Sequence, residues 1–164
     1  MSEAPLVPGT VAEHTICLLV KLGQVAFKIA EDGIAATGLR VRHYSVLQAL
    51  ADNGAMPQLA LGSFLRIDPA TMVTSLDDLE RAGCAERTRD PQDRRRYAVD
   101  ITAEGRKVLA RLNRTLVDLD GEILADLGTT ERQSLHVLLD SLAGSPALTS
   151  LFDTVREQNG GKRA

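Results

Sequence analysis

The fold is decided by residues 57–102, which read PQLALGSFLRIDPATMVTSLDDLERAGCAERTRDPQDRRRYAVDIT. The apolar spacing in the first half predicts two short helices joined by a tight turn at Arg66-Ile67. Asp68 suits the N-cap of the second helix, and Pro69 suits its first position, where a missing N–H costs nothing. Gly83 is expected to end that helix, and beyond it the period changes from that of a helix to that of strands.

A β-hairpin is expected to follow the second helix. Residues 84–89 and 95–101 read as its strands, with Asp-Pro-Gln-Asp at 90–93 turning between them. The hairpin carries the strongest positive charge in the chain, on Arg87, Arg89, Arg94, Arg95 and Arg96. Such guanidinium groups can bind phosphates or enter a narrow minor groove, although a basic hairpin can also be a solvated surface feature. Two short helices followed by a hairpin predict a winged helix.

Helical patterns flank this region on both sides. We expect helices at about 11–31 and 41–52 before it, with Asp32-Gly33 stopping the first, and at about 103–127 and 129–142 after it. The helix from 103 carries a leucine heptad stripe, made of Leu109, Leu112, Leu116, Leu119 and Ile123. This stripe is too apolar to face water, so it packs against the first helix, against a second copy of the chain, or against both.

Composition and charge narrow the class of protein. The net charge of −3 over 164 residues is not that of a polycation, so nucleic-acid binding would need locally concentrated positive charge. No apolar run approaches the roughly 20 residues that span a bilayer, and we expect no membrane partner. Cys17 and Cys84 lie far apart, which is typical of free thiols in a reducing compartment, so we expect a cytoplasmic protein. The sequence shows no metal-ligand spacing, nucleophile–base pair or phosphate loop, and predicts no enzyme, metal or cofactor.

Several short motifs together resemble the MarR family of transcription regulators. The wing run at 90–96, with Asp93 and Arg95 as an Asp-x-Arg pair, is followed by Val-Asp-Ile-Thr at 99–102 and by Gly105. Upstream residues match the family's helix-turn-helix in order and spacing: Leu61, Leu65, Ile67, Asp68, Leu79 and Gly83. The resemblance implies a mostly α fold with a small β-hairpin wing. It implies a winged helix-turn-helix DNA-binding domain at 39–105 and a helical dimerisation region at 11–38 and 106–164. The first ten residues hold two prolines and a glycine, which predicts a flexible arm at 1–10.

The resemblance also implies which residues contact double-stranded DNA. The helix from Pro69 would enter the major groove of a near-palindromic operator. The implied DNA-binding residues are Ser63, Ala70, Thr71, Val73, Thr74, Arg87, Arg89, Asp93, Arg94, Arg95 and Arg96. Here the sequence departs from the family, because Thr74 and Asp78 stand where basic residues are common. Asp77, Asp78 and Glu80 against Arg81 make this helix acidic. Residues 39–102 hold nine arginines and nine acids, so a winged-helix protein-interaction module without DNA binding stays an alternative.

As members of the family commonly do, the chain is expected to bind a small aromatic or amphiphilic effector that relieves repression. Candidate contacts are His14, Cys17, Lys21, Arg40, His43 and Tyr44. Each has a structural alternative: Tyr44 as a core residue with a satisfied hydroxyl, and Lys21 and Arg40 as solvated side chains. Some relatives sense peroxide through one cysteine, and Cys17 stands in a similar place with Lys21 one turn later. In those sensors, tyrosines hydrogen-bond the cysteine thiolate. The first helix here has no tyrosine, and Tyr44 is the only residue that could replace them. An inert Cys17 is therefore favoured.

Overall fold

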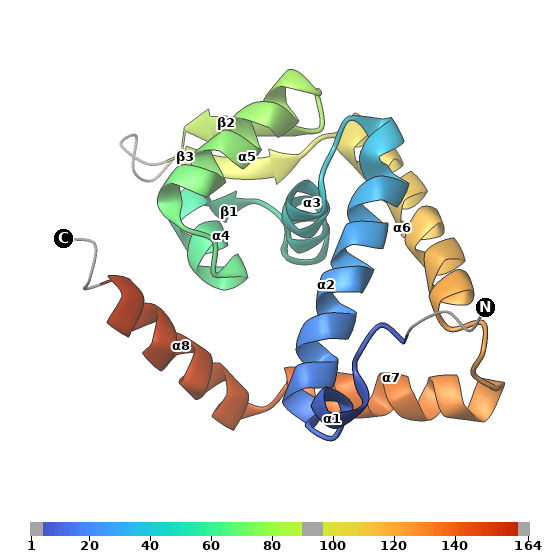
Figure 1. The fold of residues 1–164 in the computed structure, drawn as a ribbon. Coiled ribbons are helices and arrows are strands. Elements are labelled where there is room, and N and C mark those ends of the chain that lie inside the picture. Colours follow the sequence, from blue (N-terminus) through green and yellow to red (C-terminus); the bar gives the residue numbers. More distant parts are fainter. Residues whose placement is uncertain (1–4, 90–96, 161–164) are drawn as a thin grey trace. The chain divides into compact units, whose positions relative to one another are not determined.

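The computed structural model describes residues 5–89 and 97–160, in two compact units divided after Ile123. The elements of the first unit are α1 (Gly9–Ala12), α2 (Thr15–Ile34), η1 (Ala35–Thr37), α3 (Val41–Asn53), β1 (Met56–Pro57), α4 (Gln58–Leu65), α5 (Pro69–Arg81), β2 (Ala85–Arg89), β3 (Tyr97–Ile101) and α6 (Ala103–Ile123) (Figure 1). The second unit holds α7 (Thr129–Ala143) and α8 (Pro146–Gly160). The expected fold, mostly α with a small hairpin, is confirmed.

Helices α4 and α5 form the expected helix-turn-helix. Arg66 makes the turn in the left-handed region, with φ of 53°. The Asp68 carboxylate then accepts the N–H of Thr71 at 2.9 Å, as an N-cap does, and Pro69 occupies the first helical position. These local contacts fix where α5 begins and therefore how its first turn is presented.

The sheet has three antiparallel strands in the order β1-β3-β2. Strands β2 and β3 pair from Ala85 opposite Ile101 to Arg89 opposite Tyr97, which confirms the hairpin over its described residues. The two-residue strand β1 pairs with the other edge of β3 and was not expected, because two residues are too few to show a strand period.

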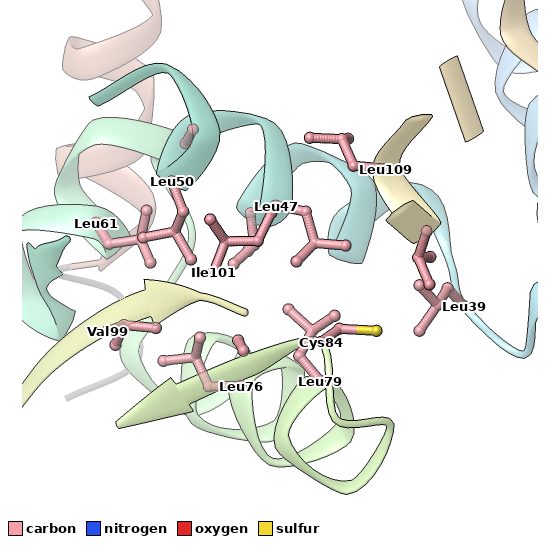
Figure 2. Close-up of a cluster of buried hydrophobic side chains, with 14 of the residues drawn as sticks. Leu39, Leu47, Leu50, Leu61, Leu76, Leu79, Cys84, Val99, Ile101 and Leu109 are labelled. Atoms are coloured by element: carbon pink, nitrogen blue, oxygen red, sulfur yellow. The ribbon is translucent and has the colours of Figure 1, made fainter. Parts of the chain in front are cut away.

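A single hydrophobic core lies between α3, α5 and the sheet (Figure 2). Leu47 and Leu50 of α3 and Leu76 of α5 are fully buried, and each such side chain contributes about 1.5–3 kcal/mol relative to an exposed one. Cys84, the residue before β2, is buried, and burial raises the pKa of its thiol. Its side chain is part of the core.

The junction between β3 and α6 explains why Gly105 follows Thr102 by three residues. The Thr102 hydroxyl donates to the Gly83 carbonyl at 2.6 Å and accepts the N–H of Gly105 at 3.0 Å. Gly105 lies so close to the chain before β2 that a Cβ there would stand 2.0 Å from the Cys84 carbonyl oxygen. Only glycine fits this contact, which sets α6 against the winged helix.

The helix expected at about 11–31 differs from the observed one at both ends. The first helix is divided, because His14 is extended and separates α1 from α2. Asp32-Gly33 does not stop α2, which continues to Ile34 and into η1. Gly33 is a site of close packing and not a terminus, since a Cβ there would meet Leu119 Cδ1 of α6 at 2.7 Å.

Only part of the heptad stripe of α6 is buried within the chain. Leu109 and Leu112 are buried in the core of the first unit, while Leu116 and Leu119 are half-buried. Ile123, at the end of the stripe, is 45 % exposed. Intramolecular packing therefore accounts for the first half of the stripe and leaves the second half partly uncovered. Helix α6 ends at Ile123, earlier than expected, and the N-cap of α7 is Gly128.

Candidate nucleic-acid interface

Helix α5 presents two contrasting faces. Met72, Leu76 and Leu79 are buried in the core and anchor the inner face. The outer face of the first turns is exposed, and it carries the predicted base-reading residues Ala70, Thr71, Val73 and Thr74. The Thr74 hydroxyl donates to the Ala70 carbonyl at 3.1 Å, which leaves its oxygen able to accept a further hydrogen bond. Ser63 of α4 is also exposed.

The acidic residues of α5 lie on its C-terminal half and are held in ion pairs. Asp78 accepts hydrogen bonds from Arg81 at 2.9 Å and from Arg42 of α3 at 3.2 Å. These bonds, that from Arg81 first, hold the pKa of Asp78 below its usual value. The carboxylate therefore stays ionised and paired, and it links α5 to α3.

Arg87 of β2 pairs with the other two acids of α5. Its Nη1 donates to Asp77 at 2.7 Å and to Glu80 at 2.5 Å, and its side chain is only 16 % exposed. Arg87 was predicted to contact DNA, but in the structure its guanidinium is hydrogen-bonded to carboxylates of the protein itself. The acids that made α5 appear unsuited to DNA are thus neutralised by arginines of the same unit.

His43 belongs to the core and not to an open ligand surface. Its side chain is 2 % exposed, and Nδ1 accepts the N–H of Arg40 at 3.1 Å, which caps the start of α3. Nε2 lies 3.3 Å from Asp78 Oδ2 without the alignment of a hydrogen bond. Burial, with the charge of Arg42, lowers the pKa of His43. The burial and the cap bond favour the structural alternative for His43, and its ligand contact stays a prediction.

The other predicted ligand residues are spread along α2 and α3. His14 is exposed at the N-cap of α2, while Cys17 and Lys21 are half-buried. The Tyr44 hydroxyl donates to Asn113 Oδ1 at 3.0 Å, and burial raises the pKa of the phenol. This bond is the satisfied hydroxyl of the structural alternative.

A cavity of about 930 Å³ lies at the C-terminal end of α2, beside η1 and α6. Arg40 lines it, and is the only one of the six predicted ligand residues to do so. The cavity has apolar walls at Ile29, Leu39 and Leu119. Its other charged lining residues are Lys28, Glu31, Asp32 and Glu122. Sequence reasoning missed these residues because they come from α2, from the segment before α3 and from α6, and share no motif.

The tip of the predicted wing falls outside the described residues. Asp93, Arg94, Arg95 and Arg96 all lie in that segment, so their assignments remain predictions from the sequence. Arg89 is described, and it is exposed at the end of β2.

Comparison with known proteins places this fold in a family. The profile of the MarR family matches residues 39–97, which span the helix-turn-helix and the start of β3. A protein assigned as the transcriptional regulatory protein for the hcr operon of Thauera aromatica is 33% identical over 141 residues, covering 85% of this chain and 84% of the relative. The chain belongs to the MarR family of transcription regulators.

Solved structures of MarR regulators share the fold. The PcaV regulator of Streptomyces coelicolor, solved with its natural ligand, is 26% identical with a TM-score of 0.67, covering 88% of this chain and 99% of PcaV. A MarR variant of Escherichia coli, solved with operator DNA, is 21% identical with a TM-score of 0.66, covering 76% of this chain and 90% of that one. These relatives are regulators and not enzymes.

Within residues 5–89 and 97–160, no single helix is long and apolar enough to cross a bilayer. The bent pair formed by α7 and residues 146–156 of α8 meets the requirement by length and composition only, with 54° between its helices.

Proposed function

We propose that this MarR-family protein is a homodimeric repressor that reads a near-palindromic operator through α5 and releases it on binding a small effector. In this proposal residues 39–105 bind DNA, and residues 11–38 and 106–164 form the dimer. Ala70, Thr71, Val73 and Thr74 face the bases, while Ser63, Arg89 and the wing residues 93–96 contact the backbone or the minor groove.

The observation that carries this proposal is the separation of charge along α5. After the N-cap Asp68, whose carboxylate accepts the Thr71 N–H, the exposed first turns of α5 hold no acid. Its three acids are paired with Arg42, Arg81 and Arg87. A paired carboxylate repels phosphate far less than a free one, so the acidic composition of the helix does not prevent approach to DNA. This weakens the alternative of a protein-interaction module, which rested on that composition.

Exposed apolar side chains support the homodimer. In the first unit, Ile16 of α2 is 69 % exposed and Val20 is 53 % exposed. In the second unit, Leu138 of α7 and Leu151 of α8 are more than 60 % exposed. Apolar stripes of this kind on helices are typical of surfaces that a partner subunit covers, and a second copy is the partner the family offers.

The cavity at the end of α2 supports an effector site, since its apolar walls stand beside five charged side chains, an arrangement that suits a small amphiphile. The alternative input, oxidation of Cys17, finds less support. The tyrosine that would have to hold its thiolate, Tyr44, donates its hydroxyl to Asn113 instead.

DNA selection followed by a salt series tests the proposal. Duplexes enriched from a random pool by the purified protein should bind at least about 10³-fold more tightly than scrambled duplexes. Affinity for both should fall as salt rises. Equal affinity for the two, or no salt-dependent binding, would contradict the proposal and favour the protein-interaction module.

A matched pair of variants assigns the binding to α5. Thr74→Ala should weaken binding to the selected duplex by roughly 1–3 kcal/mol if Thr74 contacts a base. Thr154→Ala is the control, because its hydroxyl makes the same bond to the carbonyl four residues earlier, at 2.9 Å, on α8. Equal effects of the two changes would remove Thr74 from the interface.

A further inference from the structure

Arg87 stands at the meeting point of three elements. Its Nε donates to Gln58 of α4 at 3.1 Å, its Nη1 to Asp77 and Glu80 of α5, and its Nη2 to the Val73 carbonyl at 3.2 Å. Four of the five guanidinium N–H groups are therefore bonded within the protein. An arginine used in this way has little left to offer a phosphate.

Glu80 strengthens this connection through the backbone. Its Oε1 accepts the N–H of Arg87 at 2.9 Å, while its Oε2 accepts from the guanidinium of the same residue. Strand β2 is at the edge of the sheet, where backbone groups have no further strand to pair with. Glu80 thus holds both the backbone and the side chain of the edge strand against α5.

The position of these contacts gives them a role in recognition. Val73, whose carbonyl Arg87 binds, is itself on the outer face of α5 that we assign to base reading. Arg89, two residues further along β2, is exposed where the strand ends. One largely enclosed guanidinium therefore connects the base-reading helix to the root of the hairpin.

We propose that Arg87 is a positioning residue for DNA binding, which fixes the base of the β2–β3 hairpin against α5 so that both contact the operator at once. The inference rests on the proposed function. A rigid connection matters because a hairpin that must be ordered at each encounter loses conformational entropy on binding. The planar fork of arginine suits the role, since lysine offers its donors from a single nitrogen.

The test is hydroxyl-radical footprinting on the operator duplex selected with the wild-type protein. At saturating protein, Arg87→Met should lose the protections that flank each half-site and keep those at its centre, with affinity reduced roughly tenfold or more. Arg89→Met is the matched control, since it removes the same charge from the same strand without touching these contacts. It should lower affinity and the salt slope while keeping every protection.

A third variant separates positioning from charge masking. Arg87→Met combined with Asp77→Asn and Glu80→Gln removes the carboxylates that Arg87 would otherwise leave uncompensated. If Arg87 positions the hairpin, this variant should still lack the flanking protections. Their recovery, or their retention in Arg87→Met, would overturn the inference.

Folding of each variant is checked by circular dichroism and thermal unfolding. If Arg87→Met does not fold, Arg87→Lys keeps the charge and should weaken the flanking protections, and a wild-type footprint from it would overturn the inference. A wild-type protein that protects no operator would instead contradict the proposed function, so the two failures are distinguishable.

Discussion

Gly105→Ala should destabilise the protein because α6 begins in contact with the chain before β2. The added methyl would stand 2.0 Å from the Cys84 carbonyl oxygen and 2.8 Å from Ile101 Cγ1. To restore an ordinary contact of about 3.5 Å, the helix must withdraw by more than about 1 Å. That movement strains the bonds of Thr102 to the Gly83 and Cys84 carbonyls, now 2.6 and 3.1 Å long.

The magnitude follows from these contacts. Overpacking costs about 1–3 kcal/mol, and each weakened hydrogen bond about 1 kcal/mol more. The better helix propensity of alanine offsets up to about 1 kcal/mol. We therefore expect a net loss of about 2–4 kcal/mol, equivalent to a Tm lower by roughly 5–15 °C.

Gly121→Ala, in the same helix, is the control for this prediction. Gly121 is exposed, and a Cβ there would meet nothing within 4 Å. Its substitution should therefore stabilise the protein by up to about 1 kcal/mol. Both variants are compared by urea unfolding at one protein concentration, because a dimer's stability depends on concentration. If Gly105→Ala proves as stable as Gly121→Ala, the proposed close contact does not exist in solution.

Four further predictions concern binding, assembly and pH. Arg95→Ala should weaken operator binding by about 1–3 kcal/mol per subunit in a titration, with Arg95→Lys recovering only part, and unchanged affinity would remove Arg95 from the interface. Leu116→Glu with Leu119→Glu should abolish the dimer in light scattering, because half-buried carboxylates would lack partners, and a persisting dimer would reassign that face. An organic hydroperoxide should leave DNA binding intact in a gel-shift assay, whereas release that Cys17→Ser prevents would establish a thiol sensor. Burial lowers the pKa of His43, so the folded state favours the neutral imidazole. The contribution of His43 to stability should therefore be complete above about pH 6.5 and decline as the pH falls below that value. Urea unfolding at pH 7.5 and 5.5 should therefore show a smaller loss for His43→Gln than for the wild type, and equal losses would refute this.

Features of the fold that rest on neighbouring residues could be predicted from the sequence. Asp68 caps α5 through a residue three positions on, and Thr102 caps α6 in the same way. Such contacts are visible in the sequence because the partners always occupy the same local spacing. The boundaries of the helix-turn-helix could be predicted for this reason.

The role of Arg87 could not be predicted, because its partners are distant in the sequence. Asp77 is 10 residues away and Gln58 is 29 residues away, and Asp78 meets Arg42 across 36 residues. A count of charges gives a neutral domain with an acidic recognition helix, but it does not say which acids are paired. Gly33 was misread for a similar reason, since its requirement for space comes from Leu119.

In the proposed complex, two copies of α5 read DNA together. A footprint of the purified wild-type protein on its selected duplex tests this arrangement. We expect two protected halves related by a two-fold axis, with their centres about one helical turn, or roughly 10 base pairs, apart. A single unsymmetrical protected stretch, or no protection at a concentration that saturates the gel shift, would contradict it.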